Sequence, residues 1–124
     1  MTNRWITQTQ FYDPDKPGNG NCMQASVASL LNLELNQVPH FAESGDPGTC
    51  WDLFEEFMES QGLYPMMLSG DRALPVMYLA SGKSARGVSH MVVMNGGELV
   101  HDPHPSRDGL LKVDLIYVLV PVRG

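Results

Sequence analysis

The 124-residue chain has few of the residues that mark a disulfide-rich, zinc-binding or membrane protein. It contains two cysteines, Cys22 and Cys50, which permit at most one disulfide and do not provide the closely spaced ligand pairs of a zinc site. No run of about 18 apolar residues occurs, so no transmembrane helix is expected. The N-terminal residues lack the apolar core of a signal peptide. We therefore expect a cytoplasmic protein whose cysteines stay reduced.

Positive charge is also scarce. The chain has eight Lys and Arg residues and 14 Asp and Glu residues, so its formal net charge is −6. Electrostatic attraction to nucleic acid or to an anionic membrane surface is therefore not expected. No repeat, low-complexity segment or linker interrupts the sequence. Residues 1–124, of which 43% are hydrophobic, predict a single domain with one core.

The order of the expected elements indicates an α+β fold. Apolar residues at helical spacing predict one helix over 22–33 and a second over about 50–61, with Thr49 as its N-cap. The β-formers in residues 5–11 predict a short edge strand. Short apolar runs in the second half predict strands at 63–68, 74–80, 88–94, 98–101 and 113–120. This order predicts N-terminal helices packed on one face of a mainly antiparallel β-sheet.

Cys22 follows a glycine-rich loop and opens the first predicted helix. Orphan backbone N–H groups and the positive end of the helix macrodipole meet at such a position. This environment favours a thiolate over a thiol and makes a cysteine a nucleophile. Cys50 also falls in the first turn of a helix, but no partner for it is evident downstream. We interpret Cys50 as a small packing residue.

A hairpin predicted around residues 95–97 carries a histidine and an aspartate on its two arms. If Asn95 to Gly97 form a three-residue loop, His90 lies opposite Asp102, with Cβ atoms about 5 Å apart. The carboxylate would then orient the imidazole and leave its other nitrogen for the thiol of Cys22. We adopt this loop and predict a triad of Cys22, His90 and Asp102.

Two alternatives to the triad follow from the same segment. A two-residue loop would place His101 opposite His90 and turn Asp102 to the other face of the sheet. A metal site is compatible with the ligand chemistry, and its candidate ligands are Cys22, His90, Asp102 and either His101 or His104. His101, however, should alternate to the sheet face opposite Asp102. We therefore expect no metal and no other cofactor.

The motifs Asn21-Cys22 before a helix of small residues, His90-Met91-Val92-Val93 and Asp102-Pro103 resemble the papain-like cysteine peptidase superfamily. The nearest patterns are small bacterial and phage domains, among them those that trim double-glycine leaders from bacteriocin precursors. The resemblance covers residues 18–33 and 88–106 and implies a papain-like fold. It also implies that Cys22 is the nucleophile, His90 the general base and then acid, and Asp102 the orienting residue.

One position of the family pattern is missing. Such peptidases usually carry a glutamine five or six residues before the cysteine, which donates a hydrogen bond to the oxyanion. This chain has Lys16 and Pro17 there. Gln10 would supply that donor if residues 13–20 are an inserted loop, and Gln8 is the second choice. The backbone N–H of Cys22 would be the other donor.

These residues together predict a cysteine hydrolase, a peptidase or amidase that forms an acyl-thioester at Cys22. Peptides and small amides are the expected substrates. Residues 81–87 precede the His90 strand and would form a basic lip, where Lys83 and Arg86 would bind a substrate carboxylate. Two alternatives stay open. One is an acyltransferase with the same triad, and the other is a non-catalytic papain-like module that binds or inhibits a partner.

Overall fold

The computed structural model describes residues 5–15 and 20–122 of the chain. Its elements, in chain order, are α1 (Cys22–Leu31), η1 (Leu35–Gln37), α2 (Pro47–Ser60), β1 (Leu63–Ser69), β2 (Met77–Ser84), β3 (Ser89–Asn95), β4 (Glu98–His101) and β5 (Leu110–Pro121). Within this described part, no helix combines the length and the apolar character that crossing a membrane requires.

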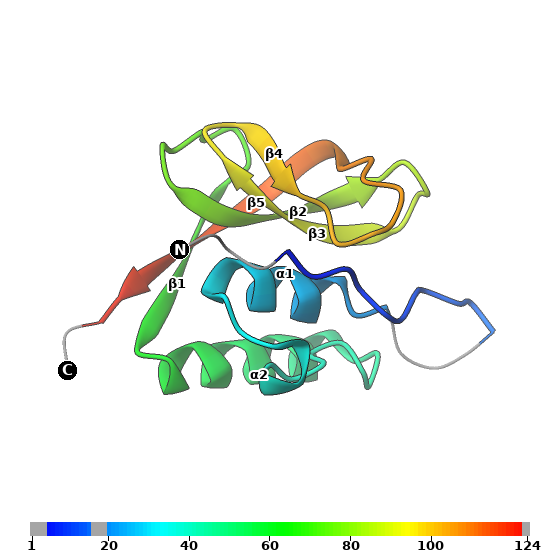
Figure 1. Ribbon diagram of the computed structural model, residues 1–124, viewed down its shortest axis with the longest axis horizontal. Coiled ribbons are helices and arrows are strands. Elements are labelled where there is room, and N and C mark those ends of the chain that lie inside the picture. Colours follow the sequence, from blue (N-terminus) through cyan, green and yellow to red (C-terminus); the bar gives the residue numbers. More distant parts are fainter. Residues whose placement is uncertain (1–4, 16–19, 123–124) are drawn as a thin grey trace.

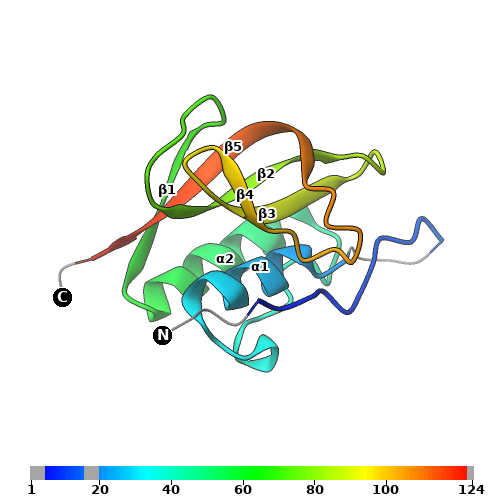
Figure 2. The same ribbon diagram turned by 45° about the horizontal axis from the view of Figure 1, so that its top comes forward.

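The strands form one antiparallel sheet in the order β1-β5-β2-β3-β4. The long strand β5 therefore separates β1 from β2, which follow each other in the chain. Both helices lie on the same side of the sheet, with α1 against β2 and β3 and α2 against β1 (Figure 1 and Figure 2). The predicted α+β fold, with two N-terminal helices packed on an antiparallel sheet, is confirmed.

Apolar side chains cover both faces of the central strands. The main core lies between the sheet and the helices and includes Val27, Phe54, Leu79 and Val93. A second cluster gathers on the other face, and its buried members are Tyr78, Ala80, Val92, Met94 and Ile116. Strands buried on both faces give continuous apolar runs instead of alternation, which explains the uninterrupted apolar runs in the sequence of β2 and β3.

The two helices begin and end at residues that differ from the predicted ones. Asn32 adopts a left-handed conformation with φ 57° and ends α1 before residue 33. Thr49 is not the N-cap of α2, because the helix begins at Pro47 and Asp46 caps it. The Asp46 carboxylate accepts hydrogen bonds from the backbone N–H and the hydroxyl of Thr49, at 2.9 and 2.8 Å.

The predicted edge strand over residues 5–11 does not form. Side chains of α1 take up backbone donors of this segment. The Ile6 N–H donates to the Ser29 hydroxyl at 2.9 Å, and the N–H groups of Thr9 and Gln10 donate to the Asn21 side chain. The segment therefore runs along α1, from its end toward its start, as an irregular chain.

The hairpin between β3 and β4 closes with a two-residue loop, but without the register that the two-residue alternative predicted, because His101 pairs with Val93 and not with His90. Gly96 and Gly97 adopt φ 63° and 83°, and Asn95 pairs with Glu98. Two consecutive residues with positive φ close a two-residue turn of the type that matches strand twist, and glycine adopts this conformation without steric cost. The prediction of a three-residue loop is wrong because Asn95 belongs to β3 instead of the turn.

A register shift further along the hairpin changes which residues face each other. Met94 pairs with Leu99, but the next pair is Val93 with His101, so one extra residue is accommodated in β4. The strand ends at His101. Asp102 therefore lies in the turn beyond β4 and is not a cross-strand neighbour of His90.

Candidate active site

His90 and Asp102 form a buried pair, with exposed fractions of 4% and 1%. The Nε2–H of His90 donates to Oδ1 of Asp102 at 2.6 Å. The backbone N–H of His104 donates to the same oxygen at 2.9 Å, and that of Gly109 donates to Oδ2 at 2.7 Å. The predicted contact between His90 and Asp102 is thus present. The turn after β4 forms this contact, because it places the Asp102 carboxylate beside the imidazole of His90.

The surroundings of this pair favour the charged form of both partners. Burial alone lowers the pKa of His90, but the hydrogen bonds and charges of Asp102 and Cys22 raise it to about 9. Burial alone raises the pKa of Asp102, but the hydrogen bonds from His90, His104 and Gly109 lower it to about 2. At neutral pH the pair is therefore an imidazolium beside a carboxylate.

Cys22 is the first residue of α1 and lies next to His90. Hydrogen bonding and charge from Cys22 are among the causes that raise the pKa of the imidazole, so the sulfur lies within interaction range of the ring. Because Nε2 of His90 is bonded to Asp102, Nδ1 is the ring nitrogen left for the sulfur. The structure therefore brings together the three residues of the predicted triad, from the start of α1, from β3 and from the turn after β4.

Cys22 and His90 line a cleft of about 720 Å³, and Asp102 lies behind the imidazole, outside the cleft wall. Aromatic side chains of Phe11, Tyr12 and Trp51 also line it. A concave apolar cleft with a few polar groups is the usual form of a small-molecule or peptide site.

Cys50 packs against the main core, as predicted, and does not line the cleft. Its sulfur lies 3.6 Å from the sulfur of Met23. Burial, and then the charge of Cys22, raise the pKa of the Cys50 thiol. Of the two cysteines, Cys22 alone thus combines exposure to the cleft with a histidine partner.

The structure brings Gln8 to the cleft and leaves Gln10 outside it. Gln8 is 6% exposed, its Nε2 donates to the backbone oxygen of Gln10 at 2.9 Å, and its Oε1 is buried without a partner. Gln10 is exposed. The choice of Gln10 over Gln8 is therefore corrected, because the segment bends at Thr9, where two successive N–H groups point to one oxygen of Asn21.

Asn21 fixes the segment that carries Gln8 to the start of α1. Its Oδ1 accepts from the N–H groups of Thr9 and Gln10 at 2.9 and 2.8 Å. Its Nδ2 donates to the Thr9 hydroxyl at 3.0 Å and to the side chain of Gln24 at 3.2 Å. The side chain is 1% exposed. The sequence placed Asn21 beside the nucleophile, but nothing in it revealed these long-range partners.

We expect Asn21→Ala to destabilise the fold by about 2–4 kcal/mol, because it leaves two backbone N–H groups of the N-terminal segment without acceptors. Urea unfolding followed by circular dichroism measures the change. Asn36→Ala, at an exposed position of η1, is the matched control and should change stability by less than about 0.5 kcal/mol. Equal stability of the two variants would contradict this role of Asn21.

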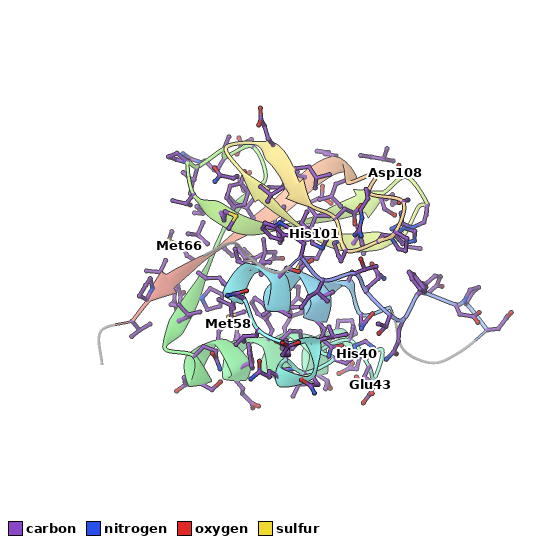
Figure 3. All side chains as sticks on the ribbon, in the orientation of Figure 1. His40, Glu43, Met58, Met66, His101 and Asp108 are labelled. Atoms are coloured by element: carbon purple, nitrogen blue, oxygen red, sulfur yellow. The ribbon has the colours of Figure 1, made fainter. Side chains whose placement is uncertain are left out.

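The other histidines lie in different surroundings. His101 donates from Nε2 to the Ile6 backbone oxygen at 2.7 Å and stacks on Trp5. His40 lies on the loop beside α2, away from the sheet (Figure 3). His104 lines the cleft, and its ring meets that of His90 edge-on at 6.2 Å. Within residues 5–15 and 20–122, no three Cys, His, Asp or Glu side chains are grouped to hold a metal ion.

Comparisons of the chain with protein-family models, with curated proteins and with solved structures return no match. The cleft and the residues that border it are therefore the features that indicate a function. The strongest observation is the buried hydrogen bond between Asp102 and His90, with Cys22 beside the imidazole.

Proposed function

We propose that this protein is a cysteine hydrolase, a peptidase or amidase that forms an acyl-thioester at Cys22. The observation that carries the proposal is the buried His90–Asp102 pair, whose imidazole lies beside the Cys22 thiol on the wall of a cleft. A base that is itself oriented by a third group is the recurring arrangement of activated nucleophiles.

In the proposed reaction, Cys22 attacks the substrate carbonyl as a thiolate and forms a carbon–sulfur bond. The protonated His90 then gives its proton to the leaving amine as the carbon–nitrogen bond breaks. Water, deprotonated by His90, attacks the thioester and releases the carboxylic acid and the Cys22 thiolate. Asp102 stays ionised throughout and stabilises the imidazolium, which is consistent with its low pKa.

Gln8 and the backbone N–H of Cys22 are the proposed oxyanion donors. One N–H of the Gln8 side chain is bonded to Gln10, and no described residue accepts the second. Cys22 begins α1, so its N–H belongs to the unpaired donors of a helix N-terminus. Fixed donors of this kind stabilise the negative charge that develops on the carbonyl oxygen.

The elements that carry the three residues support a papain-like affiliation for this site. The cysteine stands at the N-terminus of a helix, whereas the histidine and the acid come from the sheet and the turn after it, in the order Cys, His, Asp. Both cysteines are free thiols, as the cytoplasm would keep them. Peptides and small amides are accordingly the proposed substrates, and the cytoplasm is the proposed location.

We expect Gln8→Ala to slow the acylation of Cys22 by p-nitrophenyl acetate by about 100-fold, because it removes one oxyanion donor. Stopped-flow detection of p-nitrophenolate measures this rate. Gln10→Ala is the matched control, since its side chain lies outside the cleft, and it should acylate at the rate of the unmodified protein. A larger fall in the acylation rate for Gln10→Ala than for Gln8→Ala would show that Gln10, and not Gln8, is the oxyanion donor.

A further inference from the structure

The cleft beside Cys22 contains one charged side chain at neutral pH besides the proposed catalytic histidine. Among the described residues that line it, Arg86 is the only Arg, Lys, Asp or Glu. The chain as a whole carries a net charge of −6, whereas the described residues that line the cleft include no carboxylate. An isolated cation in an otherwise acidic protein attracts anions to that point.

Arg86 has no carboxylate partner among residues 5–15 and 20–122. Its Nη1 donates to the hydroxyl of Ser106 at 3.3 Å, and most of its guanidinium donors stay unused. Lys83, the other basic residue of the predicted lip, does not line the cleft. The structure therefore leaves Arg86 as the candidate contact for an anionic group of a ligand.

Ser106 connects Arg86 to a second donor, the imidazole of His104. Nδ1 of His104 accepts from the backbone N–H of Ser106 at 3.0 Å and lies 2.9 Å from its hydroxyl. In the neutral ring, the proton is therefore on Nε2, for which the described residues offer no acceptor. Arg86 and His104, joined by Ser106, thus provide several unused N–H donors at the wall of the cleft.

These donors lie on the His90 side of the cleft. The ring centroids of His104 and His90 lie 6.2 Å apart. Arg86 belongs to the turn between β2 and β3, which leads directly into the strand of His90. In the proposed reaction His90 protonates the leaving amine, so the leaving group must lie beside His90. An anion bound at Arg86 is therefore part of the leaving group instead of the acyl group.

Building on the proposed hydrolase function, we propose that Arg86, Ser106 and His104 form an anion subsite for a carboxylate on the leaving amine. The substrate class is then an amide whose leaving amine carries a free carboxylate, as the last residue of a peptide does. The Cys22 sulfur bonds to the acyl carbon, the carbon–nitrogen bond breaks, and the C-terminal residue departs with the proton of His90. Water then releases the shortened peptide.

Two alkylating reagents of similar size and different charge test the subsite without a known substrate. Iodoacetate carries a carboxylate, and iodoacetamide is neutral. We expect the ratio of their rates at Cys22 to fall about tenfold in Arg86→Gln, since a charged hydrogen-bonding partner is lost. Lys83→Gln removes the same charge from the same hairpin outside the cleft and should keep the ratio. An unchanged ratio in Arg86→Gln would overturn the subsite.

The leaving-group assignment is tested with N-acetylated peptide mixtures that end either in a carboxylate or in a carboxamide. We expect the last peptide bond to be cleaved about tenfold faster in the carboxylate mixture, mainly through a lower KM, and Arg86→Gln to remove this preference. Equal cleavage of both mixtures, or cleavage of neither, overturns the inference. If the inference fails but the protein turns over p-nitrophenyl acetate, the hydrolase proposal stands. If the protein does not turn over p-nitrophenyl acetate either, the hydrolase proposal is overturned as well.

Discussion

His90→Ala will slow the alkylation of Cys22 by iodoacetamide at pH 6 by about 100-fold, the range in which a positioned base contributes. The imidazole lies beside the thiol and carries a positive charge at this pH, since its pKa is about 9. A cationic base beside the sulfur promotes its attack on the reagent, and alanine removes that base. Timed mass spectrometry of the Cys22 peptide gives the rate, with the Cys50 peptide as an internal reference.

His40→Ala is the matched control for this experiment, because it removes an imidazole from the loop beside α2 (Figure 3). In this variant, iodoacetamide should alkylate Cys22 at the same rate as in the unmodified protein. Thermal unfolding of both variants establishes that the comparison is made between folded proteins. If Cys22 of the unmodified protein reacts at pH 6 no faster than a simple thiol, the hypothesis of an activated nucleophile fails.

Asp102→Ala will destabilise the fold by about 3–5 kcal/mol, because it leaves a buried imidazolium without its partner. It also removes the acceptor of the backbone N–H groups of His104 and Gly109. Urea unfolding at pH 6 measures the change. Asp108→Ala is the control, since Asp108 is an exposed carboxylate in the same loop (Figure 3) and should cost less than about 0.5 kcal/mol.

The same pair sets a pH window for stability. The pKa of Asp102 falls from its ordinary value of 3.8 to about 2, so its contribution is present above pH 3.8 and lost as the pH falls toward 2. The pKa of His90 rises from 6.5 to about 9, so its contribution is complete below pH 6.5 and lost as the pH rises through 9. Stability from the pair is therefore complete between about pH 4 and 6.5.

Asp102→Ala should flatten this profile at both ends, because neither carboxylate nor salt-bridged imidazole remains to titrate with a shifted pKa. Unfolding free energies at several pH values between 3 and 9 provide the test. A variant that keeps the pH profile of the unmodified protein would show that other groups determine it.

The secondary structure of this chain is largely encoded in local patterns. Apolar spacing located both helices, and short apolar runs located the five strands within a few residues. The placement of β5 between β1 and β2 depends on pairing between segments far apart in the sequence, which local patterns do not contain. The cap of α2 was missed because Asp46 and Thr49 are both good caps, and only the helix geometry shows which accepts from the other.

The predicted partnership of His90 and Asp102 is present for a reason that the sequence did not show. Counting residues across the hairpin assumed an uninterrupted ladder, whereas the structure has a shorter turn and a register shift in β4. The carboxylate reaches the histidine because the turn after β4 supplies two backbone N–H groups that hold it. Such a turn depends on tertiary contacts, among them the hydrogen bonds of Arg107 to the Thr7 hydroxyl and of the Gln8 N–H to the Pro103 backbone oxygen.

The most direct test of Cys22 as the acyl-forming nucleophile is peptide mapping by mass spectrometry after brief exposure to p-nitrophenyl acetate. We predict an acetyl group on Cys22 that appears with the first release of p-nitrophenolate and is then lost by hydrolysis, with none on Cys50. His90→Ala should not form this adduct on the same timescale. Acetylation of Cys50 as fast as that of Cys22, or p-nitrophenolate release without acetyl-Cys22, would contradict the proposed mechanism.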